Sequence, residues 1–106
     1  MRKLVLPLPG VEEGVSYGTP AFRVRGKFFL RLREDGDLVV RIDQGERYFL
    51  MQRDPETFYI TDHYRNWAGV LVRLAIVDPE ELRELLQHAW RPLASKKMVE
   101  AFDHKR

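Results

Sequence analysis

The sequence predicts an α+β fold, in which a single-layer antiparallel sheet of about five strands is covered on one face by helices. Residues 20–42 contain three runs of alternating apolar and basic residues, joined by two short glycine-containing segments, which is typical of consecutive antiparallel strands. Helix start signals follow at Asp43 and Asp78. The 106 residues suffice for one domain, so we expect a single domain over residues 1–106.

The composition is that of a globular protein with a strongly charged surface. Hydrophobic residues make up 44% and charged residues 32% of the chain, and the net charge is only +2, so the distribution of charge matters more than its sum. The absence of cysteine excludes disulfides, thiolate zinc sites and cysteine nucleophiles, and it fits a cytoplasmic location. The single asparagine and the predominance of arginine over lysine point to a thermophilic source.

We expect no membrane segment and no signal peptide. No apolar run approaches the roughly 20 residues that span a bilayer. The N-terminal apolar stretch is short, is interrupted by Pro7 and Pro9, and is not followed by a small-residue cleavage site.

Residues 1–19 give the weakest structural signal. The apolar residues from Leu4 to Leu8 predict a short helix or an edge segment, since Pro7 and Pro9 oppose a long helix. Residues 11–14 are expected to add one helical turn, and residues 16–20 are expected to form a loop.

Three strands are predicted over residues 20–25, 27–33 and 38–42. Gly26-Lys27 and the Asp35-Gly36 segment provide the two tight connections. Side chains alternate between the two faces of a strand. The predicted core face carries Phe22, Val24, Phe28, Leu30, Leu32, Leu38, Val40 and Ile42, whereas Phe29 and Val39 are predicted on the outer face.

A helix and two further strands follow. Asp43 with Glu46 predicts an N-cap and a helix that ends near Arg53. The β-branched and aromatic run 57–61 predicts a strand with Phe58 and Ile60 inward. Residues 62–68 form a polar and aromatic loop, and residues 69–75 predict a strand with Leu71 and Arg73 on the outer face.

The second helix has the clearest local signal. Asp78 is the expected N-cap, Pro79 occupies the first helical position, and Glu81 completes the capping pattern. One apolar stripe follows, consisting of Leu82, Leu85, Leu86, Ala89 and Trp90. Pro92 ends this helix, and a last helix over residues 95–103 is expected to pack Met98, Val99 and Phe102.

Three sequence blocks resemble a known family: LPGVEEGVSYGTPAFRVRGKFF, TDHYRNWAGVLVRL and DPEELRELLQHAWRPLASKK. Their residues, order and spacing are similar to the MmcQ/YjbR family of small bacterial proteins over about residues 8–103. The resemblance implies a fold like that of the secretion-chaperone-like α+β proteins. It also implies DNA as a partner, because family members are commonly called DNA-binding proteins. The chain departs from the family pattern in its N-terminal helix, which is reduced to a few residues with two prolines.

The predicted outer face of the sheet is the first candidate binding site. It carries Phe29, Tyr59 and six arginines, and no acidic residue falls inside a predicted strand. Guanidinium groups bind phosphates, and aromatic rings stack on bases. The alternatives are a solvated face whose arginines pair with acids of the same chain, and a surface for an acidic protein. The candidate residues are Arg23, Arg25, Arg31, Arg33, Arg41 and Arg73.

Two smaller sites are also predicted. If Ser95 caps the last helix, Lys96 and Lys97 lie in its first turn, where an anion would offset the unfavourable helix dipole; two ordinary solvated lysines are the alternative. A candidate ligand pocket combines Tyr17 with loop residues near the fourth strand, although a hydrogen-bonded turn is the alternative there. Those loop residues are Asp62, His63 and Trp67.

No catalytic motif is present, so we predict that the protein is not an enzyme and requires no cofactor. The chain lacks GxSxG, a glycine-rich phosphate loop and histidines at metal-ligand spacing. Glu12 and Glu13 are adjacent and would diverge on a helix. The predicted function is a binding module with DNA as its candidate partner. The alternative is a protein-interaction or chaperone-like homodimer that uses Phe29, Val39, Tyr59 and Leu71.

Overall fold

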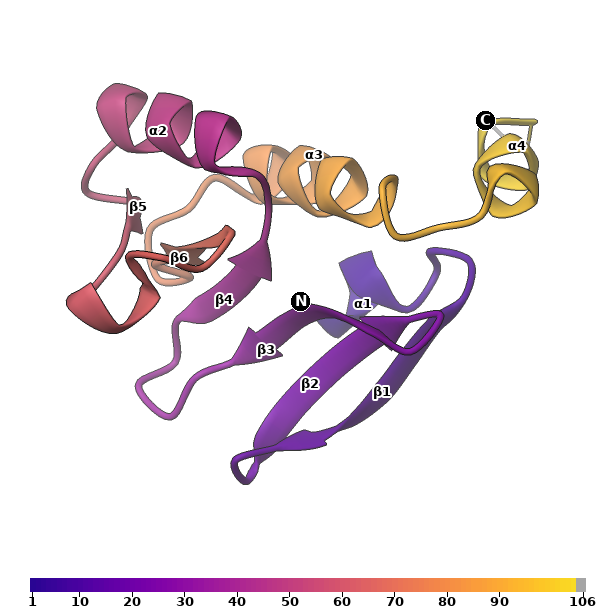
Figure 1. The fold of residues 1–106 in the computed structure, drawn as a ribbon, viewed down its shortest axis with the longest axis horizontal. Helices are drawn as coiled ribbons and strands as arrows, with labels where there is room; N and C mark the ends of the chain where they lie inside the picture. The colour runs from indigo at the N-terminus through magenta and orange to yellow at the C-terminus, as the bar shows by residue number, and fades with distance from the viewer. Residues whose placement is uncertain (105–106) are drawn as a thin grey trace.

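The computed structural model describes residues 1–104, which form a six-stranded antiparallel sheet in the order β1-β2-β3-β4-β6-β5 (Figure 1). The predicted α+β class is therefore confirmed. The elements in chain order are α1 (Arg2–Val5), β1 (Val11–Ser16), β2 (Thr19–Val24), β3 (Lys27–Leu32), β4 (Leu38–Arg41), α2 (Gln44–Arg53), β5 (Phe58–Tyr59), the 3₁₀ helix η1 (Asp62–Tyr64), β6 (Gly69–Val72), α3 (Pro79–Trp90) and α4 (Lys96–His104).

The hydrophobic core lies between the sheet and the helices, which gather on one side of it (Figure 1). The whole apolar stripe of α3 is buried, as predicted. Trp90 is fully buried, and its indole nitrogen donates a hydrogen bond of 2.8 Å to the carbonyl oxygen of Pro9. This bond ties the segment after α1 to α3. Among residues 1–104, no helix has the length and apolar character needed to cross a membrane.

The predicted helix starts are confirmed by their cap geometry. The Asp43 carboxylate accepts a hydrogen bond of 2.8 Å from the backbone N–H of Glu46, and Asp78 accepts one of 3.0 Å from Glu81. The hydroxyl of Ser95 likewise accepts a bond of 3.2 Å from the backbone N–H of Met98. Local sequence therefore determines where these helices begin.

The predicted helical turn at residues 11–14 is wrong, because this segment is part of β1. The Tyr17-Gly18 turn, with φ angles of 54° and 79°, folds β1 back onto β2 as a hairpin. Pairing with β2 satisfies backbone groups of β1, and Arg2 forms an ion pair of 2.7 Å with Glu13. The sheet therefore has six strands in the described chain, and Glu12 and Glu13 place acidic residues in a strand where none was predicted.

The predicted faces of Phe28 and Phe29 are reversed by a β-bulge in β3. Arg23 pairs with Phe28, but the next residue of β2, Phe22, pairs with Leu30, so Phe29 is an extra residue in β3. Phe29 consequently lies in the core with no exposed surface, and Phe28 lies on the outer face beside Arg23.

Three strand boundaries also differ from the prediction. The turn between β2 and β3 is Arg25-Gly26, with φ angles of 54° and 78°, so Arg25 lies at the hairpin tip and not on the outer face. β5 contains only two residues, because Ile60 has already left the sheet. β6 ends at Val72, and Arg73 follows it with a backbone hydrogen bond of 2.9 Å to Thr57.

Candidate functional site

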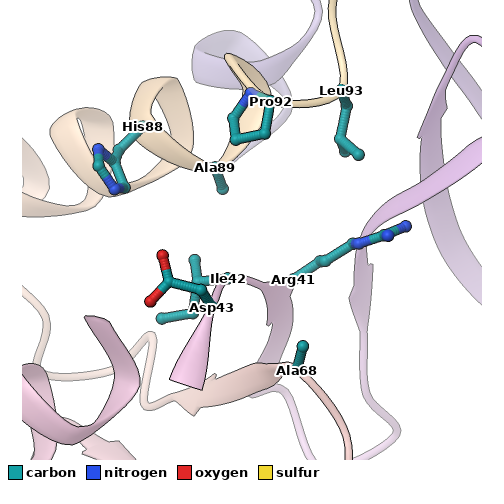
Figure 2. Close-up of a pocket in the computed structure, with 8 residues that line it drawn as sticks. All are labelled: Arg41, Ile42, Asp43, Ala68, His88, Ala89, Pro92 and Leu93. Atoms are coloured by element: carbon teal, nitrogen blue, oxygen red, sulfur yellow. The ribbon is translucent and has the colours of Figure 1, made fainter. Parts of the chain in front are cut away.

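The structure contains a cleft on the helix side of the sheet, between the end of β4 and the C-terminal end of α3 (Figure 2). Its volume is about 320 Å³, and much of its wall is apolar. The Asp43 carboxylate caps α2, His88 lies 3.9 Å from Glu46, and the Arg41 side chain runs away from both Asp43 and His88 (Figure 2). The polar groups at this cleft are thus engaged elsewhere or point away from it.

A second and larger hollow lies on the outer face of the sheet, opposite the helices. It has a volume of about 590 Å³, within the range of ligand sites in proteins. We call it the aromatic hollow. Its lining residues are Tyr17, Phe28, Arg31, Glu34, Val39, His63, Tyr64 and Trp67.

One wall of the aromatic hollow is a chain of aromatic rings. The ring centroids of Phe28 and Trp67 lie 5.5 Å apart and those of Tyr64 and Trp67 lie 5.8 Å apart, and in both pairs the rings meet edge to face. His63 extends the chain, with its ring 5.0 Å from that of Tyr64. The bulge supplies Phe28 to this wall, and the loop between η1 and β6 supplies Trp67.

Arg47 of α2 holds that loop in place. Only 9% of Arg47 is exposed, and its guanidinium donates hydrogen bonds to four backbone carbonyl oxygens of the loop. The accepting residues and distances are Tyr64 (3.2 Å), Arg65 (3.1 Å), Trp67 (2.8 Å) and Gly69 (3.2 Å). Arg47 was not predicted from the sequence as a functional residue. Its position could have indicated burial, because Arg47 precedes the buried Leu50 by about one helical turn and therefore lies on the same face of α2.

Arg31 lies beside the aromatic wall and is almost completely buried. Its Nη1 donates to the Thr19 hydroxyl (3.1 Å), the Leu32 carbonyl oxygen (3.4 Å) and Glu34 Oε1 (3.2 Å). Its guanidinium carbon lies 5.2 Å from the centre of the Tyr17 ring. The N–H groups at Nε and Nη2 have no acceptor within residues 1–104. Arg31 lies on the outer face, as alternation predicted, but these contacts bury its side chain and leave little of it accessible to a phosphate.

Glu34 is the acidic residue of the hollow. Its side chain is 64% exposed, and one carboxylate oxygen pairs with Arg31. A hydrogen bond from its own backbone N–H, and next the Arg31 guanidinium, lower the pKa of this carboxyl. Glu34 therefore offers an ionised acceptor beside a fixed donor.

The remaining predicted basic residues do not form one continuous row. Arg33 pairs with Asp35 at 3.4 Å, and Arg73 donates to the Glu56 carbonyl oxygen and lies over the Tyr59 ring. Exposed basic side chains flank the hollow instead: Arg23 is paired in register with Phe28 and with Glu12, and Arg25 occupies the adjacent turn. Arg41 is also exposed, but it lies at the cleft on the helix side of the sheet and does not line the hollow.

The two lysines of the last helix do not join the outer face. Met98, one residue after Lys97, packs beside Gly10 and the core, so α4 lies on the helix side of the sheet. Both Lys96 and Lys97 are exposed there.

The predicted ligand pocket is partly assembled. Tyr17, His63 and Trp67 line the aromatic hollow together, but Asp62 does not and forms an ion pair of 2.5 Å with Arg65 instead. Within residues 1–104, no group of three or more histidine or acidic side chains is placed to hold a metal ion.

The apolar outer-face surface expected for a homodimer is not exposed. Phe29 is in the core, and Val39 and Leu71 are 2% and 0% exposed. Tyr59 is partly buried and donates a short hydrogen bond to Asp37.

Comparisons with known proteins agree with the fold and the sequence blocks. Uncharacterised proteins of Mycobacterium tuberculosis and Mycobacterium bovis are each 39% identical over 69 residues, which cover 63% of this chain and 54% of theirs. The chain thus spans about half the length of these curated relatives. The crystal structure of Deinococcus radiodurans protein DR2400, which contains a DUF419 domain, matches with a TM-score of 0.70 and 22% identity over 84% of this chain and 72% of that chain.

The family assignment depends on the match to a family model. The model of the YjbR family matches residues 6–92, a range that includes β1 to β6, the loop with Trp67 and all of α3. This chain therefore belongs to the YjbR family, as the three sequence blocks indicated.

Proposed function

We propose that this protein is a non-enzymatic binding module, active in the cytoplasm, whose outer sheet face binds single-stranded DNA. The observation that carries the proposal is the aromatic hollow, where Phe28, Tyr64 and Trp67 form a wall next to exposed arginines. Bases stack on such rings, with a typical contribution of about 1–3 kcal/mol per base.

The exposed cations near the hollow are suited to the phosphates between stacked bases. Arg23 lies beside Phe28, and Arg25 and Lys27 are exposed in and next to the adjoining turn. Because most other arginines of this face are paired within the chain, we expect few phosphate contacts. For a single strand, each phosphate contact contributes about −0.7 to the slope of log affinity against log salt concentration. Contacts from these three side chains therefore predict a slope of about −2.

A single strand fits this surface better than a duplex does. Base faces are accessible in a single strand, whereas a duplex stacks them against each other. The hollow is a concave site, and the row of arginines that would follow a duplex backbone is interrupted by the internal pairing of Arg31 and Arg33.

Fluorescence anisotropy with a labelled single strand and the matching duplex, from about 50 to about 200 mM salt, tests the proposal. We expect Trp67→Leu to weaken single-strand binding about tenfold, and Arg23→Glu with Arg25→Glu to weaken it and flatten the salt slope. Matched controls on the helix side are Tyr48→Leu and Lys97→Glu, which should bind like the wild type. Two results would overturn the proposal. One is that the wild type and Trp67→Leu each bind the duplex and the single strand with equal affinity, and the other is that no binding occurs at the lowest salt.

A protein partner is the second candidate function, but at a different surface from the one predicted. Tyr48 and Phe49 of α2 are 68% and 59% exposed, whereas the predicted apolar outer-face residues are largely buried. If a homodimer forms through α2, light scattering should give twice the monomer mass, and Phe49→Ser should return it to the monomer mass. A monomer at all concentrations removes this candidate.

A further inference from the structure

The aromatic hollow contains a hydrogen-bond donor and an acceptor side by side. Arg31 Nη1 and Glu34 Oε1 are 3.2 Å apart, and both residues line the hollow next to the aromatic wall. Arg31 is 9% exposed and held by three hydrogen bonds from Nη1, so its remaining N–H groups have fixed positions. A planar ligand that stacks on the wall can therefore meet a donor and an ionised acceptor along one edge.

The bases differ in how they match this arrangement. Guanine presents an acceptor, O6, next to two donors, N1–H and the N2 amino group, on the same edge. An arginine that donates to O6 and a carboxylate that accepts from both nitrogens satisfy all three groups. Adenine and cytosine present one amino donor on that edge, and thymine presents a single N–H between two carbonyl oxygens that would face the carboxylate.

We infer that the aromatic hollow selects guanine, with Arg31 donating to the O6 oxygen, Glu34 accepting from the N1 and N2 hydrogens, and Trp67 stacking on the ring. This inference rests on the proposed function, because it adds a preference for one base to the proposed binding of single-stranded DNA. The Tyr17 ring beside the Arg31 guanidinium strengthens the selection, because it further restricts the guanidinium to one orientation.

The test uses a labelled oligothymidine of about 12 nucleotides in which one central thymine is replaced by guanine, adenine or cytosine. We expect the guanine oligonucleotide to bind about tenfold more tightly than oligothymidine. Glu34→Gln replaces one carboxylate acceptor with an amide donor and should remove this preference, which is measured as the ratio of the guanine-oligonucleotide affinity to the oligothymidine affinity within the same variant. Glu34 is exposed, so the variant keeps the fold. Glu84→Gln, at an exposed position of α3, is the matched control and should retain the preference.

The outcomes separate this inference from the proposed function. Equal affinity for all four oligonucleotides overturns the guanine preference but leaves single-strand binding intact. No binding of any oligonucleotide, together with no quenching of Trp67 fluorescence by deoxyguanosine monophosphate, overturns both. Quenching by that nucleotide without binding of any oligonucleotide supports the guanine site, assigns it to a free nucleotide and overturns the proposed function.

Discussion

The indole of Trp67 occupies the space that a side chain at position 69 would need. A Cβ added to Gly69 would lie 2.0 Å from Cζ3 of Trp67, far inside the contact distance of two carbon atoms. Gly69 is on the outer face because the next residue, Val70, points into the core. The missing side chain at Gly69 therefore allows Trp67 to lie against the sheet and form part of the hollow's wall.

Gly69→Ala should displace Trp67 from the sheet. We expect a loss of about 1–3 kcal/mol in the free energy of unfolding from the steric conflict, and a red shift of the Trp67 emission as the ring becomes exposed. The matched control is Gly14→Ala in β1, where nothing lies within 4 Å of the added Cβ. Wild-type emission in Gly69→Ala would contradict the packing of these two residues.

Arg47→Met should loosen the aromatic loop. The substitution leaves four backbone carbonyl oxygens without their donor, one of them buried at Gly69, and we expect a loss of about 2–3 kcal/mol. Urea denaturation measures the effect, and faster hydrogen exchange in residues 64–69 locates it. Arg83→Met, on the exposed side of α3, is the control. The same urea midpoint for both variants would show that Arg47 does not anchor the loop.

Tyr59 should make the protein less stable in alkali. Burial, followed by its hydrogen bond to Asp37, raises the pKa of Tyr59 to about 12. Because the phenol of the unfolded chain ionises at about pH 10, the stability from the neutral phenol is complete below that pH and is lost as the pH rises through the folded-state value of about 12. Tyr59→Phe should reduce the decline in urea midpoint above about pH 10, and an unchanged decline would exclude this role.

Asp78→Ala should weaken the start of α3 by about 1 kcal/mol, since the N–H of Glu81 loses its acceptor. Thermal denaturation measures the change. Asp78→Asn is the control, because asparagine is an equally good N-cap and should retain most of the stability. If both variants lose the same amount, the effect comes from the lost charge and not from the cap.

Much of the fold was predictable because its signals are local. Asp78, Pro79 and the leucine stripe of α3 identify a helix without reference to the rest of the chain, and alternation identifies β2 and β4. β1 was missed because its Glu-Glu-Gly segment has little strand propensity of its own. The Tyr17-Gly18 turn and the pairing with β2 determine its conformation.

The site was only partly predictable, because its geometry depends on contacts between distant segments. Tyr17, His63 and Trp67 were recognised from their loop positions, but strict alternation placed Phe28 on the wrong face. Alternation also gave the correct face for Arg31 without its burial, which results from Thr19 and Glu34. Arg47 acts on a loop about twenty residues away along the chain, and no local pattern contains that information.

The extra residue in β3 has a consequence for how the site is gained or lost between relatives. Phe28 is already opposite the outer-face residue Arg23, so deletion of Phe29 alone would restore regular alternation with Phe28 still in the wall of the hollow, and the core would lose a fully buried ring. The wall would lose Phe28 if the strand kept its length without the bulge, because Phe29 would then be opposite Arg23 and Phe28 would be opposite the core residue Val24. The register between β2 and β3, rather than the length of β3, therefore determines whether a relative presents an aromatic residue to the hollow.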